Sequence, residues 1–459
     1  MLDCRSEARM TSHVCKFGGT SLADATQLAK VRAIVEADPR RRYLVPSAPG
    51  RRQRDDAKIT DLLYLCYEHA RQGLPFGEIF DQIATRYRQI VSSLNISIAI
   101  DRELRVIQNG INERCRLPEG PHYAASRGEY LLGKILAQWL DVAFIDPTSL
   151  IFFDQQGRLD ESRTYRTIAK LLAKCERAVI PGFYGTAVDG TIQTFSRGGS
   201  DISGAVVARG VGAALYENWT DVSGLLMADP AIIPNPKTID VISYHELREL
   251  AYMGATVLHD EAIFPVRGTG VADDSIPIHI LNTNQPEESG TRIVSEAGPP
   301  THSNMITGIA GRKDFTVIAL EKTLMNTEVG FGRRALSVLE RHQISFEHLP
   351  SGIDTMSLVI EEAQLCSKRD QVIQDLKREC NPDSIMTYPD MALIATVGRG
   401  MTHTPGMAAR LFAAMANSGV NVRMIDQGSS ELNIIVGVEA TDFEQAVRAI
   451  YQTFVESKE

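Results

Sequence analysis

The stretch from Val14 to Ser21 constrains the fold most, because a short apolar run there ends on two glycines and leads into a helical pattern. Gly18 and Gly19 let the backbone approach a bulky anion, and the amides that follow them at a helix N-terminus would point at its oxygens. Lys16 precedes the glycines, whereas in a P-loop the glycines precede the lysine. The stretch therefore predicts a phosphate-binding turn of a different phosphoryl-transfer fold. The alternative is an ordinary strand-to-helix turn with a solvated lysine.

The length of 459 residues exceeds what one compact core holds and indicates two or three domains. The net charge of -9 argues against a nucleic-acid binder, since binding to a phosphate backbone needs a basic face. No apolar run is long enough to span a membrane, and residues 1–11 carry no apolar secretory segment. The seven cysteines form no CxxC pair, which disfavours disulfides and a zinc site, and we expect a cytoplasmic protein.

Strand-like and helical patterns alternate through the first half of the chain. Strands are expected at 43–50, 142–145, 178–180 and 213–216, and helices at 58–70, within 76–116, from Arg127 onward and at 202–209. Such alternation favours an α/β domain in which a largely parallel sheet has helices on both faces. Ligands of such domains bind at the carboxyl ends of the strands.

The pattern changes from Ile306, where a small unit of strand, helix, strand, strand and helix occurs twice. The strands are expected at 316–320, 356–360, 392–397, 420–422 and 432–436, and the helices at 332–342, 406–418 and 442–454. A polar stretch with glycine and proline at 295–303 separates this region from the first. We therefore expect a catalytic domain at 12–298 and two smaller domains at 304–380 and 388–459.

A second glycine cluster runs from Thr194 to Asp201 and leads into an apolar helix. Arg197 precedes its two glycines, and arginine offers the planar fork that suits a carboxylate. Asp201 is expected to orient Lys16 or to lie close to a metal ion. The alternative for Asp201 is simple capping of the helix that follows.

A third cluster runs from Asn218 to Gly224 and continues to Asp229. It has the pattern of a strand end and a loop, which suits contacts with a ribose and with phosphates. Alone it is a weak signal, because Asp-Pro and Ser-Gly pairs are common in turns.

Five motifs occur in the order typical of aspartate kinases, and the chain resembles this family over nearly its whole length. They are KFGGTS from Lys16, SRGE from Ser126, SRGGSD from Ser196, WTDV from Trp219 and GATVLH from Gly254. The two C-terminal units resemble a tandem pair of ACT domains. The resemblance implies a three-layer αβα amino acid kinase fold followed by two ferredoxin-like ACT units.

The resemblance implies ATP-dependent phosphorylation of the side-chain carboxylate of L-aspartate to 4-phospho-L-aspartate, the first step of lysine, threonine and methionine synthesis. A carboxylate is already a nucleophile at neutral pH, so catalysis reduces to positioning and to neutralising charge on the moving phosphoryl group. Mg²⁺ is expected to be bridged by the nucleotide phosphates, because no dedicated set of carboxylate ligands is visible.

The resemblance also implies roles for individual residues. Lys16 would stabilise the transferring phosphoryl group, and Asp201 would organise Lys16. Glu129 would bind the ammonium group of aspartate, and Arg197 its α-carboxylate. The other implied contacts are with aspartate (Ser47 and Thr60) and with ATP (Lys16, Gly18, Gly19, Thr20, Ser200, Thr220, Asp221 and Asp229).

The chain departs from the family at positions associated with the nucleotide. Members often have a lysine at Thr256, an aromatic residue at Leu226 and an arginine at Ala231, and a proline often follows the position of His259. These departures do not affect the residues implied to bind aspartate. They do mean that the family pattern does not predict which residues contact the purine and the ribose. A subgroup of the family has a small residue at the lysine position, so its loss does not imply inactivity.

Two other functions compete with aspartate kinase activity. One is an amino-acid sensor with a kinase-like body, and the other is a kinase for glutamate, acetylglutamate or a carbamate. A sensor has no physical need for a phosphoryl-stabilising lysine, and this argues against the first. Glu129 and the ACT pair favour aspartate as the substrate.

The first repeat resembles the effector pocket of lysine-sensitive relatives. The residues implied are Met325, Glu328, Phe331, Ser345 and Glu347, of which Glu328 or Glu347 would pair with the ammonium group of the ligand. Lysine is the expected effector and threonine the second candidate. The ACT units are also expected to join a homodimer or a higher homo-oligomer, and a dimer platform without any effector is the alternative.

Overall fold

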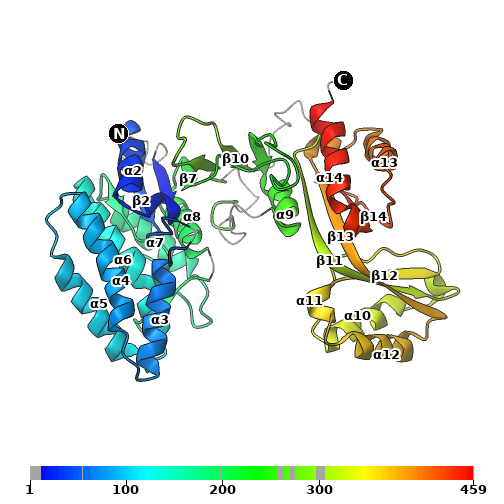
Figure 1. Cartoon of the computed structure of the whole chain (residues 1–459), viewed down its shortest axis with the longest axis horizontal. Helices are drawn as coiled ribbons and strands as arrows, with labels where there is room; N and C mark the ends of the chain where they lie inside the picture. Colours follow the sequence, from blue (N-terminus) through cyan, green and yellow to red (C-terminus); the bar gives the residue numbers. More distant parts are fainter. Residues whose placement is uncertain are drawn as a thin grey trace. The chain divides into compact units, whose positions relative to one another are not determined.

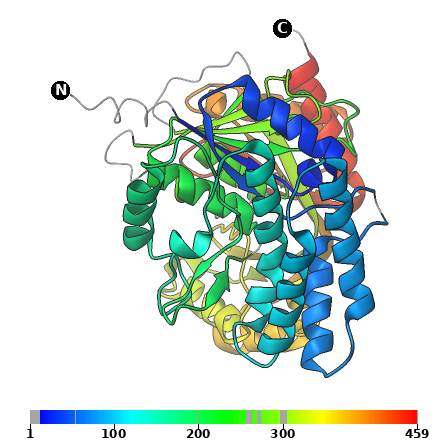
Figure 2. The same ribbon diagram turned by 90° about the vertical axis from the view of Figure 1, so that its left-hand side faces the viewer.

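The computed structural model describes residues 12–53, 55–196, 198–255, 263–268, 274–295 and 305–457. It comprises two compact units, shown as ribbons in Figures 1 and 2. The first unit takes its described residues from Met1–Leu225, Asp240–Tyr244 and Val257–Gly298, and the second from Leu226–Ile239, His245–Thr256 and Pro299–Glu459. Two segments that precede residue 298 therefore group with the C-terminal part of the chain.

The first unit is built on an eight-stranded sheet with the strand order β3-β4-β2-β1-β7-β9-β10-β8. Neighbouring strands are parallel, except that β9 and β10 are antiparallel. The predicted α/β class with a largely parallel sheet is confirmed. The strands are β1 (His13–Phe17), β2 (Arg41–Pro46), β3 (Ala143–Phe144), β4 (Ala178–Val179), β7 (Leu215–Thr220), β8 (Val241–Ser243), β9 (Ile278–Asn282) and β10 (Thr291–Val294), and β5 (Tyr184–Thr186) pairs separately with β6 (Ile192–Thr194).

Helices cover both faces of this sheet (Figure 1). Cys15 and Phe17 of β1 belong to a buried core shared with α2 to α6, and Lys16 between them faces the other side, because side chains alternate along a strand. On that other side lies α8, and α7 packs against it where Gly210 meets Ile168. The helices are α2 (Ala25–Ala37), α3 (Ile59–Arg71), α4 (Gly77–Ser93), α5 (Ile100–Arg114), α6 (Gly120–Leu140), α7 (Glu161–Leu172) and α8 (Gly199–Val211), with single 3-10 turns η1 (Thr20–Leu22) and η2 (Pro147–Ser149).

One helix start was predicted wrongly. Helix α6 begins at Gly120 and not at Arg127, so Glu129 lies in the interior of a long helix. Pro121 stands in the first turn, where its fixed φ and missing amide hydrogen are tolerated. This proline marks the true start better than the glycine at 128. Gly128 serves close packing instead, since a Cβ there would lie 2.8 Å from Cβ of Ala48.

The second unit contains a five-stranded antiparallel sheet with the order β12-β11-β13-β15-β14. Its strands are β11 (Gly308–Glu321), β12 (Thr355–Glu361), β13 (Ser384–Val397), β14 (Met424–Asp426) and β15 (Asn433–Glu439). Its helices are α9 (Tyr244–Tyr252), of which all but the first residue belongs to this unit, α10 (Phe331–Arg341), α11 (Glu362–Leu365), α12 (Arg369–Cys380), α13 (Met407–Asn417) and α14 (Phe443–Tyr451). Short helical turns η4 (Met325–Thr327), η5 (Arg399–Met401), η6 (Ala440–Asp442) and η7 (Gln452–Glu456) complete it.

The two repeats share their longest strands. Strands β11 and β13 each run for 14 residues, whereas the sequence predicted only short strands within them. The first part of β11, Gly308–Arg312, pairs with Leu393–Val397, and its second part, Phe315–Glu321, pairs with Ser384–Met391 and with β12. The repeats are therefore halves of one continuous sheet.

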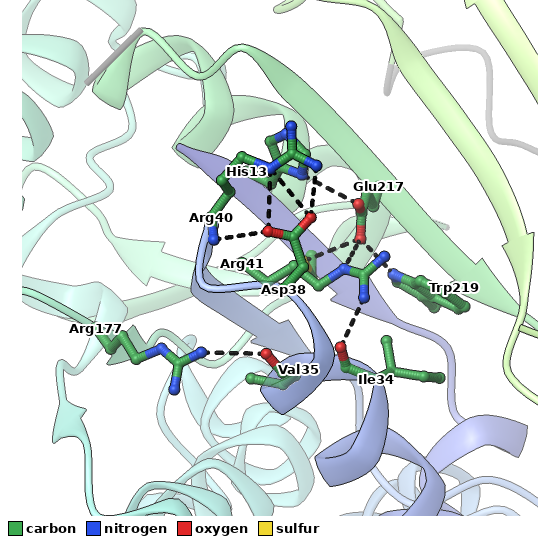
Figure 3. A network of polar contacts seen from close by, with 10 residues as sticks. His13, Ile34, Val35, Asp38, Arg40, Arg41, Arg177, Glu217 and Trp219 are labelled. Atoms are coloured by element: carbon green, nitrogen blue, oxygen red, sulfur yellow. Dashed lines mark hydrogen bonds and ion pairs between the residues drawn. The ribbon is translucent and has the colours of Figure 1, made fainter. Parts of the chain in front are cut away.

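A buried polar network joins the amino ends of the central strands (Figure 3). The carboxylate of Glu217 accepts hydrogen bonds from Nδ1 of His13 at 3.2 Å, Nε of Arg41 at 2.8 Å and Nε1 of Trp219 at 2.8 Å. Burial alone would raise the pKa of Glu217, but the bonds from His13 and Arg41 outweigh it and lower the pKa to about 2. The network joins β1, β2 and β7 at the ends opposite to their carboxyl ends, where the ligand site is predicted.

None of the described helices is both long and apolar enough to cross a membrane.

Candidate active site

Lys16 lies near the carboxyl end of β1 and is buried. Its Nζ is 2.5 Å from Oδ1 of Asp201, in the first turn of α8, and 3.3 Å from Oδ1 of Asn218, on β7. Nδ2 of Asn218 donates to the same Asp201 oxygen at 2.9 Å. The ammonium group on β1 is thus fixed by two consecutive elements, α8 and β7, that lie about 200 residues further along the chain.

The capping alternative for Asp201 is wrong, because the N-cap of α8 is Gly198 and no side chain caps the helix. Gly198 has φ 72°, in the left-handed region that favours glycine. Asn218 was named at the sequence level only as the start of a loop cluster. Its position two residues from the end of a central strand, facing the same side as Lys16, is the signal that would have placed it in the site.

The glycine turn after β1 differs from the expected helix start. The amides after Gly19 lead into the single turn η1, and α2 begins only at Ala25, with Asp24 as its N-cap accepting from N of Gln27 at 2.9 Å. Gly19 has φ −60°, which any residue can adopt. Glycine suits this position because a Cβ would lie 3.0 Å from the carbonyl oxygen of Ala48 and 3.1 Å from Cα of Gly50, both in the loop that follows β2.

Glu129 is buried next to this loop, with 5% of its surface exposed. The amide of Ala48 donates to its carboxylate, while Oε2 has no hydrogen-bond partner. Burial raises the pKa of Glu129 to about 8, more than the backbone hydrogen bonds lower it. A buried carboxylate with an unused oxygen is suited to a cationic ligand group.

The remaining predicted contacts are Ser47, Thr60 and Arg197 for aspartate and Ser200 for ATP. Ser47 follows β2, and its amide donates to the carbonyl oxygen of Phe17 at 3.1 Å. Thr60 is in the first turn of α3 and is half-buried. Ser200 lies against Gly182, just after β4, where a Cβ on the glycine would come within 2.8 Å of the serine Cβ. Arg197 lies outside the described residues.

The predicted nucleotide residues are divided between the two units. Thr220 ends β7, and its hydroxyl donates to Oδ1 of Asp221 at 3.2 Å. Asp229 lies in the segment that groups with the second unit, together with Leu226 and Ala231, and accepts from the amide of Ala231 at 2.8 Å. The remaining departures from the family are Thr256 and Asp260, which stands where a proline often follows His259, and they lie outside the described residues.

No group of three or more His, Cys, Asp or Glu side chains within the described ranges is placed to hold a metal ion. The cation fixed at this site is the ammonium group of Lys16. Held beside the glycine turn, it can neutralise negative charge on a ligand without being reorganised, which is the arrangement that phosphoryl transfer requires.

The predicted effector residues all lie in the second unit. Met325 and Phe331 are part of the buried core of the first half, and Ser345 is exposed, its amide donating to Oε1 of Gln364 at 2.9 Å. Glu328 pairs with Lys322 at 3.0 Å and with Arg334. Glu347 accepts a hydrogen bond from the hydroxyl of Tyr252. Both candidate acids therefore already have partners.

The amino acid kinase family matches residues 12–282, and an ACT domain matches residues 394–454. Since the first match covers more than half of the chain, the chain belongs to the amino acid kinase family.

Its relatives within that family are aspartokinases. Aspartokinase 3 of Bacillus subtilis is 37% identical over 96% of this chain and 98% of its own length. The crystal structure of Clostridium acetobutylicum aspartate kinase is 53% identical, covers 97% of this chain and 100% of that chain, and has a TM-score of 0.88. Aspartokinase III of Escherichia coli, solved with aspartate and ADP, is 26% identical over 96% of this chain and 99% of that chain, with a TM-score of 0.72. The predicted assignment to the aspartate kinases is confirmed.

Proposed function

We propose that this chain transfers the terminal phosphoryl group of ATP to the side-chain carboxylate of L-aspartate, giving 4-phospho-L-aspartate. The observation that carries the proposal is the ammonium group of Lys16, fixed by Asp201 and Asn218 beside the glycine turn. The Escherichia coli relative solved with aspartate and ADP supports the same pair of ligands.

The substrate carboxylate is itself the nucleophile, so the enzyme needs no general base. Lys16 neutralises the charge that spreads over the phosphoryl oxygens as the bond to the leaving group breaks. Asp201 and Asn218 hold the lysine in place before the reaction begins, and this preorganisation makes the charge effective.

On the aspartate side, the unused oxygen of Glu129 accepts from the ammonium group of the substrate, and Arg197 binds its α-carboxylate through a two-pronged ion pair. Ser47 and Thr60 complete this subsite. An ammonium group next to Glu129 favours its charged form, so aspartate binding offsets the cost of burying that carboxylate.

On the ATP side, Gly19, Thr20 and Ser200 donate to phosphate oxygens, and Thr220 and Asp221 contact the nucleotide. The amide of Gly18 is not available for a phosphate, because it donates to the carbonyl oxygen of Trp219 at 2.9 Å. Mg²⁺, held by the phosphates, supplies further positive charge when bound.

The test is a steady-state assay of purified protein with ATP, Mg²⁺ and one acid at a time. Turnover with aspartate, and at least about a hundredfold less with glutamate, acetylglutamate or carbamate, is expected, since a misplaced carboxylate loses in-line geometry. Faster turnover with another acid than with aspartate would show that this acid, and not aspartate, is the substrate. Binding of aspartate without any turnover would identify a sensor.

Regulation by lysine, with threonine as the second candidate, is proposed for the first ACT half. Its support is the Escherichia coli aspartokinase III structure solved with lysine and aspartate, 25% identical with a TM-score of 0.73 over 97% of this chain and 100% of that chain. A ligand ammonium group would replace Lys322 or Arg334 at Glu328, or Tyr252 at Glu347.

Calorimetry with lysine and threonine, in the presence and absence of ATP and aspartate, tests this regulation. Effector binding should weaken by about 5- to 150-fold when both substrates are present, because coupling between two sites is reciprocal. Binding of neither amino acid would leave the ACT halves with a structural role. We also propose a cytoplasmic homodimer or higher homo-oligomer assembled through these halves, which sedimentation of the full chain tests.

A further inference from the structure

Arg86 lies in the middle of α4 and is buried, with 5% of its surface exposed. Its Nη1 is 2.5 Å from Oδ2 of Asp56, and its Nη2 donates to the carbonyl oxygen of Gly50. Its Nε donates to the carbonyl oxygen of Ala23 at 3.4 Å. One guanidinium group thus reaches acceptors on two separate loops.

The first of these loops carries the proposed phosphate side of the site, and the second begins at Ser47 on the proposed aspartate side. Ala23 ends the turn that contains Gly18 and Gly19, whereas Gly50 and Asp56 lie between β2 and α3. The loops touch through their backbones, because the amide of Gly50 donates to the carbonyl oxygen of Gly19 at 2.7 Å. A side chain on Gly50 would overlap the backbone of Gly19. Arg86 therefore stabilises the contact between these two loops, since it binds Ala23 on one and Gly50 and Asp56 on the other.

The same loop also supports the aspartate side. The amide of Ala48 donates to the carboxylate of Glu129, and Ala48 packs directly on Gly128. Tyr87, the neighbour of Arg86 on α4, donates from its hydroxyl to the carbonyl oxygen of Gly128 at 2.8 Å. A displacement of the 48–56 loop would disturb both subsites at once.

We propose that Arg86 is a positioning residue that clamps the 48–56 loop onto the glycine turn and so sets the ATP and aspartate subsites together. The inference deepens the proposed function and rests on it. The geometry requires arginine, since a planar fork donates in several directions at once whereas a lysine offers one compact charge. Asp56 is the loop's own anchor, bound also by the backbone amide of Arg52 at 3.1 Å.

The experiment compares Arg86→Met and Arg86→Lys with Arg88→Met. Arg88 lies on the same helix and pairs with Asp101 at 2.8 Å, but its side chain is 50% exposed, so it controls for loss of charge and of helix propensity. For Arg86→Met, the KM values for ATP and aspartate should both rise at least about tenfold while kcat changes much less. The reason is that misplaced loops weaken the binding of the substrates and of the transition state equally. Arg86→Lys should restore part of both KM values, and Arg88→Met should match the parent.

A lower melting temperature for Arg86→Met with both KM values unchanged would show a merely structural arginine and overturn the proposal. If Arg86→Met does not fold, Asp56→Ala removes the side-chain acceptor at the loop end of the clamp. Unchanged KM values in that variant overturn the proposal equally, and a joint rise supports it. Should the parent lack aspartate kinase activity, the proposed function fails by itself, and the affinity for ADP measured by calorimetry in parent and variants then decides on the clamp.

Discussion

Replacing Glu129 by glutamine should make the protein more stable at alkaline pH and worse at binding aspartate. The pKa of Glu129 rises from 4.5 to about 8 because the carboxyl group is buried. Each pKa unit corresponds to about 1.4 kcal/mol, so ionising this group in the free enzyme costs about 5 kcal/mol. Glutamine has nearly the same shape and does not ionise, and it escapes this cost.

The sign of the pH dependence follows from the raised pKa. The protonated side chain stabilises the folded state fully below about pH 4.5, and this contribution is lost as the pH rises through about 8. In the parent, the free energy of unfolding should therefore fall by about 1.4 kcal/mol per pH unit across this window as far as Glu129 is concerned. In Glu129→Gln this slope should be absent. Urea denaturation of both proteins at several pH values measures the difference.

Aspartate affinity should change in the opposite direction. Loss of a charged partner for a buried ammonium group costs about 3 kcal/mol, which raises the KM for aspartate by about a hundredfold. In the parent, the KM for aspartate should fall as the pH approaches 8, because more of the free enzyme carries the carboxylate that the substrate needs. Equal KM values for parent and variant, or parallel stability profiles, would refute this account of Glu129.

Three further substitutions test other parts of the molecule. Lys16→Ala should lower kcat at least about a hundredfold with an unchanged melting temperature, because one preorganised charge on the phosphoryl group is worth about 3 kcal/mol, and near-normal turnover would contradict its role. Arg197→Lys should raise the KM for aspartate, since a point charge does not replace a two-pronged contact, and a saturation curve that overlays the parent's would contradict the clamp. Glu217→Gln should lower the free energy of unfolding by about 3 kcal/mol at neutral pH in urea denaturation. Because the pKa of Glu217 is lowered to about 2, the parent should lose this stability only as the pH falls from about 4.5 toward 2, and an unchanged acid transition in the variant would contradict the network's contribution.

The class of fold followed from local patterns, but the details of the site did not. Alternating strands and helices predicted the parallel sheet, since each element shows its own periodicity. The local pattern left the role of Asp201 open, and only the family motifs favoured its pairing with Lys16, because two residues on separate elements leave no trace in local spacing. Asn218 and Arg86 escaped prediction for the same reason: a polar residue on a strand or helix shows its partner only once the chain is folded.

The repeats illustrate a second limit of sequence reasoning. The two copies were visible because each has its own order of strands and helices. Their shared sheet was not visible, because β11 carries bulges near Arg312 to Val317, at the start of the predicted strand 316–320, that interrupt the pattern without ending the strand.

The shared strands β11 and β13 also determine when this half of the protein becomes able to fold. A chain that leaves the ribosome presents β11 first, and the partner that covers one whole edge of it is β13, which follows only after α12. Until Val397 has emerged, β11 exposes a long unpaired edge of the kind that recruits strands from other chains. A protein truncated at Cys380 would keep that edge permanently, so shortening the chain between the repeats should produce aggregation and not an isolated first ACT domain.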